Sequence, residues 1–243
     1  MTFTTEGIVV RQTRYGDHGL VVNIYTRLEG MRPFMVRGGL KPGGKFRPSC
    51  FFPLSQVEIS YARGKQHTGL PFLREAKLTY PYRAMYSDVR KSSVALFLSE
   101  VMSRFITQAE QDESFYGKIA LALREFDSQD GHSAEFHLFF LLELSEALGF
   151  YPRMESPQAY FDLREGCFGC RPPLHADFLQ GDLAAGLARL LDERSLKGNF
   201  PSLTLFPSAL RFSLVQALTR YCQLQSGVEG NFKSLSVLRE LFS

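Results

Sequence analysis

The chain contains no run of about 18 uncharged apolar residues, and this excludes a helix that spans a bilayer. Its first residues lack the basic-then-apolar pattern of a secretion signal, and it has only four cysteines. We therefore expect no disulfide framework, no membrane association and a cytoplasmic location. With 44% apolar and 22% charged residues over a length of 243, the chain is expected to be an ordinary globular protein.

Enzyme signatures are also missing. The sequence has no G-x-S-x-G elbow, no H-E-x-x-H and no Cys–His frame, and its five histidines are scattered. His137 lies within an apolar segment, which is typical of a core residue rather than a ligand. A hydrolase would need a cleft with shifted carboxylates or histidines, for which no frame exists, so we predict that the protein is not an enzyme.

Metal ligands are too few for a convincing site. Cys167 and Cys170 form a C-x2-C pair, which is half of a structural zinc site. Cys50 and Cys222 fall in other regions, and His175 offers only a third ligand. We predict no metal and no other cofactor, with two free thiols in a tight turn; a zinc site that includes Cys167 and Cys170 is the alternative.

Charge is distributed unevenly along the chain. Residues 1–80 have 12 Lys and Arg against 5 Asp and Glu, a balance of +7, whereas residues 81–243 have 16 against 20, a balance of −4. A basic first third predicts that a polyanion binds there. Ordinary surface charge that happens to cluster is the alternative.

The first eighty residues predict five strands and no helix. Segments rich in β-branched and aromatic residues alternate with turn residues. The expected strands are 5–15, 20–28, 31–37, 56–62 and 70–78. Five short strands in this length fit a small closed barrel. Pro71 should lie at the beginning of its strand or on an edge, because it has no N–H to donate.

Helices are predicted after Pro81. Ser87 and Asp88 form an N-cap and first-turn pair, and apolar residues recur behind them at helical spacing. The segment from Glu135 to Leu148 is apolar nearly all round, so it should be central, and Gly149 should end it. The further expected helices begin after Asp112-Glu113 and cover 183–191, 208–225 and 234–242. We therefore predict an α+β chain: a β-barrel domain over 1–80 and a helical domain over 81–243, with an irregular insert at about 152–178 that contains at most a short hairpin at 160–163.

A glycine-rich basic segment runs from Arg37 to Pro48. It contains four glycines and two prolines, which disfavour regular structure, and four cations: Arg37, Lys41, Lys45 and Arg47. Such a loop beside a barrel can follow a phosphodiester backbone and release its counterions. Part of it matches G-x-x-x-x-G-K, but Phe46 occupies the Mg²⁺-binding Ser or Thr position and Pro48 discourages the following helix, so a P-loop is disfavoured. A solvated loop without a ligand is the alternative.

Aromatic residues are interspersed among these cations. They are Tyr15, Tyr25, Phe34, Phe46 and Tyr61. Since alternate residues of a strand face inward, about half of them should belong to the core and the rest could stack on bases. We expect Phe34 in the core and Tyr15, beside the Gly16 turn, as a contact.

Together these segments resemble the RecO family in order and spacing. The barrel part matches in Gly7-Ile-Val-Val-Arg11, Tyr15-Gly16-Asp17, Tyr25-Thr26, Glu29-Gly30 and Arg37-Gly38. The helical part matches in Val94 to Val101 and Phe139 to Leu144, running into Leu148 to Pro152. Phe161-Asp-Leu163 with Gly166-Cys167 resembles the stretch between the two zinc knuckles of some members. Here Arg153-Met154-Glu155 occupies the region of the first knuckle, which supports the prediction of no zinc and a degenerate zinc-finger-like insert.

The resemblance implies an oligonucleotide-binding (OB) fold, a helical domain and a nucleoid-associated role in DNA repair through the RecF pathway. Family members bind single- and double-stranded DNA, anneal complementary strands and help load recombinase onto strands coated by single-strand-binding protein. Their partners are RecR and the C-terminal tail of the single-strand-binding protein. The alternative function is an adaptor that binds acidic peptide tails and has no DNA affinity of its own.

The expected DNA contacts are basic side chains of the first domain and one aromatic. They are Arg11, Arg14, Tyr15, Arg37, Lys41, Lys45, Arg47, Arg63 and Lys65. Annealing then needs no catalytic residue, because neutralising charge on a basic surface brings two strands together.

Overall fold

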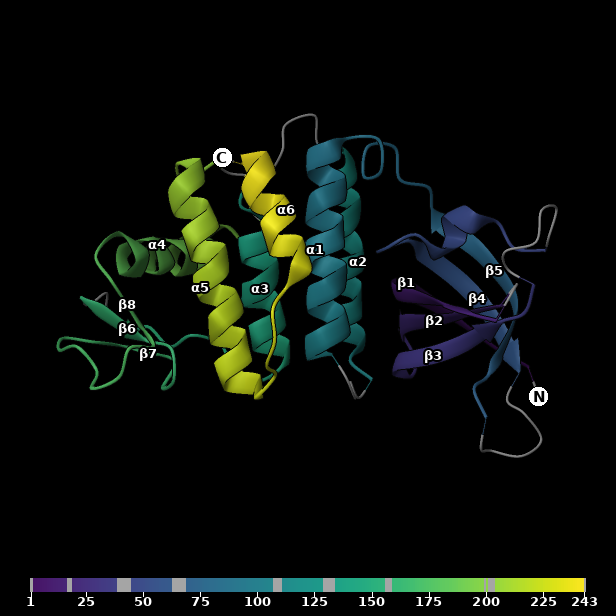
Figure 1. The fold of residues 1–243 in the computed structure, drawn as a ribbon, viewed down its shortest axis with the longest axis horizontal. Coiled ribbons are helices and arrows are strands. Elements are labelled where there is room, and N and C mark those ends of the chain that lie inside the picture. The colour runs from purple at the N-terminus through teal and green to yellow at the C-terminus, as the bar shows by residue number, and fades with distance from the viewer. Residues whose placement is uncertain are drawn as a thin grey trace. The chain divides into compact units, whose positions relative to one another are not determined.

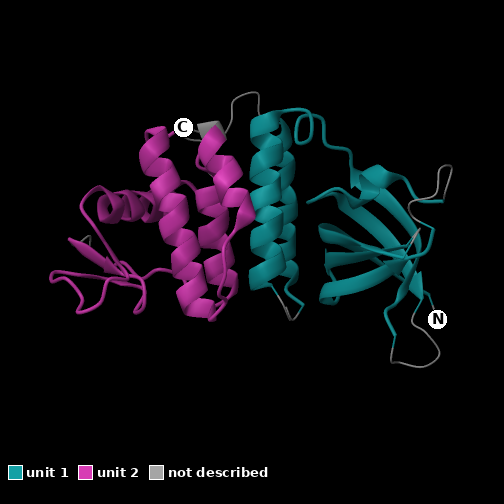
Figure 2. Ribbon diagram, viewed as in Figure 1, with its two compact units in different colours: residues 1–128 teal, residues 129–243 magenta. Residues whose placement is uncertain are grey.

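The structure is a computed structural model, and it describes residues 2–16, 19–38, 45–62, 69–106, 111–128, 134–155, 159–198, 200 and 204–242. The chain divides into two compact units, Met1–Ser128 and Gln129–Ser243 (Figure 2). Within the described ranges, no helix combines the length and the apolar character that a membrane span requires.

Unit 1 begins with a closed five-stranded barrel in the order β1-β2-β3-β5-β4 (Figure 1). The strands are β1 (Thr2–Tyr15), β2 (Gly19–Thr26), β3 (Gly30–Val36), β4 (Gln56–Ala62) and β5 (Phe72–Tyr80). The prediction of a barrel of five strands, as in an OB fold, is confirmed. Pro71 lies just before β5, and its carbonyl accepts a hydrogen bond from Met35 N–H at 2.9 Å.

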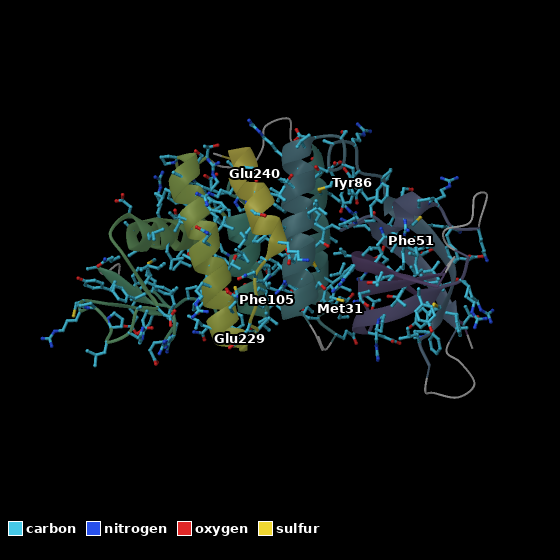
Figure 3. The ribbon with its side chains drawn as sticks, viewed as in Figure 1. Met31, Phe51, Tyr86, Phe105, Glu229 and Glu240 are labelled. Atoms are coloured by element: carbon cyan, nitrogen blue, oxygen red, sulfur yellow. The ribbon has the colours of Figure 1, made fainter. Side chains whose placement is uncertain are left out.

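The barrel interior is filled by side chains from alternate strand positions. Phe34 is 1% exposed, which confirms its predicted place in the core. The four-residue 3₁₀ helix η1 (Pro48–Phe51) adds Phe51 (Figure 3), whose ring lies 5.8 Å from that of Phe46. Both rings are buried, so the segment that follows the glycine-rich loop is anchored on the barrel.

Register shifts in two strands redirect side chains. In β1, Val10 is an extra residue between two paired ones, and its carbonyl accepts a hydrogen bond from the Ser99 hydroxyl. β5 has two extra residues, Thr79 and Arg74. Arg74 lies between Leu73 and Glu75, which pair with consecutive residues of β4. A bulge of this kind bends the strand and changes where its side chain points.

Two helices pack onto the barrel and belong to the same unit. They are α1 (Val89–Phe105) and α2 (Glu113–Ser128). The predicted Ser87–Asp88 pair marks the start of α1, one residue later than expected: Asp88 is the N-cap and accepts hydrogen bonds from the N–H groups of Arg90 and Lys91. The buried amide of Gln56 donates to the carbonyl of Ala120 at 2.7 Å and accepts from Arg124 Nε at 2.8 Å. The barrel itself ends at Tyr80, whereas the compact unit extends to Ser128, so the domain boundary expected at residue 80 stays a prediction.

The buried carboxylate of Asp127 fixes the chain as it leaves the barrel. It accepts hydrogen bonds from the backbone N–H groups of Arg83, Ala84 and Met85 at 2.7 to 2.9 Å. The Lys91 ammonium donates to the Asp127 carbonyl at 2.9 Å and thereby links α1 to α2. One residue near the end of α2 therefore holds both the exit turn of the barrel and the neighbouring helix.

Unit 2 is mainly helical. Its elements are α3 (Phe136–Ala147), β6 (Tyr160–Asp162), β7 (Cys167–Gly169), β8 (Phe178–Gln180), α4 (Asp182–Lys197), α5 (Ser208–Ser226) and α6 (Lys233–Phe242). Residues 136–145 of α3 are all buried, which confirms that this apolar helix is central. Gly149 follows with φ +83°, the left-handed conformation predicted for the helix end.

The region predicted to be an irregular insert contains a small sheet in the order β7-β6-β8. The expected hairpin at 160–163 is confirmed, but the expectation of otherwise irregular structure is wrong, since a third strand pairs with β6. The sheet is held by aromatic contacts: the buried ring of Phe161 lies 4.9 Å from Phe168 and 5.7 Å from Tyr221 of α5. Each strand has three residues, too few to be distinguished from a loop by periodicity.

A buried ion pair joins the start of α3 to the start of α5. Glu135 is fully buried and accepts hydrogen bonds from the N–H groups of Leu205 and Phe206 and from Arg211 Nε at 3.2 Å. Arg211 also donates to the carbonyl of Phe206 at 2.8 Å. These contacts fix the segment that leads into α5.

His137, the second residue of α3, is expected to make the stability of unit 2 depend on pH. It is 3% exposed, and burial together with nearby Arg211 lowers its pKa from 6.5 to about 3. Between these values the unfolded chain binds a proton that the folded chain does not, so the free energy of unfolding decreases as the pH falls below about 6.5. We expect a loss of about 1.4 kcal/mol per pH unit between about pH 6 and pH 4.

Urea unfolding of the wild type and of the neutral variant His137→Gln across this pH range tests the assignment. The slope against pH is the readout, because the substitution can also change the stability at pH 7. Carboxylates contribute to the slopes of both proteins alike. The two slopes should therefore differ by the contribution of one bound proton, about 1.4 kcal/mol per pH unit. Identical slopes would show that His137 is charged in the folded protein.

Candidate nucleic-acid interface

The register of the ladders brings several loops to one end of the barrel. Arg14 pairs with Leu20, and Leu20 pairs in turn with Val36 at the end of β3. Phe72 at the start of β5 pairs with Ala62 at the end of β4, and the bridge between β3 and β5 lies at this same end. The β1–β2, β3–β4 and β4–β5 connections all begin here, so this end is called the loop end below.

The opposite end of the barrel is covered by the helices of unit 1. Arg27, which follows β2, donates from Nε to Glu113 of α2 at 2.8 Å. Gln56, the first residue of β4, contacts α2. The hydroxyl of Tyr86 (Figure 3) donates to the Pro53 carbonyl at 2.9 Å. The loop end is thus the end of the barrel that α1 and α2 leave open.

The described members of the predicted DNA-binding set are all exposed. Arg11, Arg14 and Tyr15 lie along the last part of β1, and the Tyr15 side chain is 64% exposed. Arg37 follows β3, and Lys45 and Arg47 precede η1. Lys41, Arg63 and Lys65 lie outside the described residues. The ladder therefore places Arg14, Tyr15 and Arg37 at the loop end, and their contact with DNA stays a prediction.

An open pocket of about 650 Å³ lies on this part of the barrel. Its lining comes from β1, β4, β5 and the two sides of the glycine-rich loop: Thr2, Arg37, Lys45, Phe46, Ser60, Leu73, Arg74 and Glu75. Three of these residues are basic and one is acidic. The acid, Glu75, lies 3.8 Å from the Lys45 ammonium, and the three cations outnumber it, so the lining has a net positive charge. Such a lining attracts anions.

Arg37 is held in a defined position on the wall of this pocket. The carbon centre of its guanidinium lies 4.0 Å from the centroid of the Phe72 ring. A cation over an aromatic face is stabilised by the ring quadrupole, and the contact restricts the plane of the guanidinium. Arg37 directly follows β3 and Phe72 is the first residue of β5, and the bridge between Met35 and Phe72 brings the two residues close together.

Arg74 is the basic residue of this pocket that the sequence interpretation missed. In a regular strand its neighbours Leu73 and Glu75 would fix its direction by alternation, but the β5 bulge breaks that alternation. The charge pattern counted Arg74 in the basic first third and gave no reason to select it. A bulge depends on pairing across strands, so no local sequence signal was available.

The interspersed aromatics are mostly core. Tyr25, Phe34, Phe46 and Tyr61 are all buried, and of the five only Tyr15 is exposed. Phe46 packs on Phe51 and is followed by the short η1 rather than an α-helix, which is inconsistent with a P-loop. A stacking surface at the loop end therefore has Tyr15 and the Arg37–Phe72 pair as its described components.

The residues present do not fit a structural zinc ion. Cys167 begins strand β7 and pairs with Asp162, so the prediction that the two thiols share a tight turn is wrong: the turn precedes Cys167. Arg153 bridges to Cys167, and its guanidinium donates to the Glu165 carbonyl, so the residue bridged to Cys167 is a cation and not a metal ligand. Among the described residues, no three His, Cys, Asp or Glu side chains gather as metal ligands would.

Two family models match this chain, one over the barrel and one over the helices that follow it. The family model described as "Recombination protein O N terminal" matches residues 1–82, and "Recombination protein O C terminal" matches residues 86–235. The chain is 31% identical to the DNA repair protein RecO of Phocaeicola vulgatus, over 98% of both chains. It is 29% identical to the protein of the same name from Flavobacterium psychrophilum, over the full length of both. These matches cover almost the whole sequence, and the chain therefore belongs to the RecO family of DNA repair proteins.

Proposed function

We propose that this protein is a recombination mediator that binds single- and double-stranded DNA at the loop end of its barrel. It anneals complementary strands there and helps to load recombinase onto strands coated by single-strand-binding protein, in the RecF pathway. RecR and the C-terminal tail of the single-strand-binding protein are its partners. Residues 1–80 act as the nucleic-acid-binding domain and residues 81–243 as the helical domain.

The basic pocket is the observation that best supports this proposal. Arg37, Lys45 and Arg74 face a common space with a single acidic neighbour, and exposed Arg14 and Tyr15 lie at the same end of the barrel. Cations arranged in this way neutralise backbone phosphates whatever the base sequence. Two strands that lose their mutual repulsion on one surface can pair, so annealing requires binding but no covalent step.

Removing charge from the glycine-rich segment should weaken DNA binding uniformly. In the triple variant Lys41→Ala, Lys45→Ala and Arg47→Ala, we expect weaker binding of all sequences, because phosphate contacts hold no sequence information. The slope of log K against log salt should flatten by about 0.7 to 1 unit per lost contact. Fluorescence anisotropy of a labelled mixed-sequence single strand, titrated at several salt concentrations, measures both quantities.

A triple variant with the same charge change in unit 2 is the control: Arg171→Ala, Arg189→Ala and Lys197→Ala. It should bind naked DNA with the wild-type salt slope. Equal slopes for the wild type and the first variant would contradict the assignment of the glycine-rich segment. If the wild type binds no DNA even at low salt, the DNA-binding role is wrong and the adaptor function remains.

A further inference from the structure

The bulge in β5 gives the loop-end pocket a cation that neither the charge pattern nor the family comparison assigns. Arg74 is the unpaired residue of that bulge and lines the pocket together with Arg37 and Lys45. Bulges next to binding sites commonly re-aim one side chain, and here the re-aimed side chain is a guanidinium that can bind phosphate through two oxygens. The bulge therefore adds a cation that can bind phosphate to the pocket.

A second arginine of the lining, Arg37, offers a cationic surface on which a base can stack. Arg37 lies against Phe72 at 4.0 Å, so one face of its guanidinium is covered by the ring, and the Arg37 side chain is exposed. Nucleic-acid bases stack on guanidinium planes as they do on aromatic rings. A base that enters the pocket would extend the stack formed by Phe72 and Arg37.

The volume of the pocket and the residues that line it are suitable for one nucleotide. Its volume of about 650 Å³ and its open shape admit a unit of a continuous strand without enclosing it. Ser60 and Thr2 add hydroxyl groups, while Leu73 and Phe46 add an apolar floor. The pocket thus combines phosphate-binding cations, a stacking surface and hydroxyl groups in one space.

We propose that this pocket binds one nucleotide of single-stranded DNA, with its base stacked on the Arg37–Phe72 pair and its phosphate held by Arg74 and Lys45. The proposal rests on the DNA-binding function proposed above and adds Arg74 as a phosphate contact and Phe72 as the residue that positions Arg37. An unpaired base is required, since a base within a duplex is not free to stack on a protein side chain.

The role of Arg74 is tested by binding of a labelled single-stranded oligodeoxythymidine at several salt concentrations. Arg74→Ala should weaken binding about three- to tenfold and flatten the salt slope by about 0.7 unit, the value for one phosphate contact of a single strand. Arg74→Lys keeps the charge and should keep the slope. The matched control is Lys77→Ala, which removes an exposed cation three residues further along β5 that does not line the pocket.

The role of the stack is tested with an abasic strand of the same length, which has phosphates but no bases. The wild type should prefer the oligodeoxythymidine by about fivefold or more, since stacking one base contributes at least about 1 kcal/mol. Phe72→Leu keeps an apolar side chain but removes the ring, and it should reduce this preference at least about threefold while binding of the abasic strand is unchanged.

The outcomes separate this proposal from the function on which it rests. If the wild type binds no single strand, the DNA-binding function and the pocket both fail. If the wild type binds with a steep salt dependence but Arg74→Ala behaves like Lys77→Ala, the pocket assignment is wrong and the DNA-binding function stands. If Phe72→Leu leaves the preference for the strand with bases unchanged, the pocket is not a nucleotide site.

Discussion

Replacing Asp127 by alanine should lower the free energy of unfolding by about 3 kcal/mol or more. The carboxylate accepts hydrogen bonds from three consecutive backbone N–H groups, those of residues 83–85, and it is 2% exposed. Without it the Met85 donor is left buried and the other two donors partly buried, all without this acceptor. A buried unsatisfied group costs about 1–3 kcal/mol, and local movement relieves part of the cost at the other two. Urea unfolding followed by circular dichroism measures the loss.

A second carboxylate in the same region provides the control. Asp88→Ala removes the N-cap of α1, which is partly exposed, and should cost only about 1 kcal/mol. Asp127→Asn keeps the oxygen that serves Ala84 and Met85 and should have an intermediate effect. Hydrogen exchange at residues 83–85 should accelerate in Asp127→Ala and remain slow in Asp88→Ala. Equal losses of stability in the two alanine variants would refute the proposed role of Asp127.

Local chemistry was sufficient to predict most elements. The start of α1 at the Ser87–Asp88 pair, the left-handed helix end at Gly149 and the five strands of the barrel each follow from one residue type or one short pattern. The buried helix α3 follows from its apolar residues on all sides. These features depend on interactions within a few residues, which is why the sequence alone predicts them.

What the sequence did not predict depends on contacts between distant segments. Gln56 is a strand residue that looks exposed in sequence, yet it is fully buried because its amide pairs with Ala120 and Arg124 of α2. Similarly, Ser99 of α1 reaches the bulged Val10. These long-range polar contacts extend the compact unit beyond the barrel, and no local pattern encodes them.

The candidate site shows the same division. Charge and glycine content selected Arg37 and Lys45, which line one pocket, and the turn beside Gly16 selected Tyr15, which is exposed. Arg74 and Phe72 were not selected, because a strand bulge and a cation–ring contact are defined only by the pairing of β5 with β4 and β3. Composition therefore selected part of the candidate site, and the pairing of the strands was needed to find Arg74 and Phe72.

Replacing Glu135 by glutamine should destabilise unit 2 by about 3 kcal/mol. Glutamine keeps a side-chain oxygen for the N–H groups of Leu205 and Phe206 but removes the negative charge that faces Arg211. Arg211 is then a buried cation without its counter-ion, and breaking a buried pair in this way typically costs about 3–5 kcal/mol. Urea unfolding, with hydrogen exchange at residues 205 and 206 as a local readout, measures the effect.

The charge is isolated by a double-mutant cycle with Arg211→Met. Methionine retains much of the arginine's apolar volume but has no charge, so Arg211→Met alone leaves Glu135 as the unpaired ion and should also be strongly destabilising. In the double variant neither ion remains, and the loss should be about 1–3 kcal/mol smaller than the sum of the two single losses. Additive losses would mean that Glu135 acts only through its backbone hydrogen bonds. Since Arg211 also donates to the Phe206 carbonyl, part of its loss should persist in the double variant.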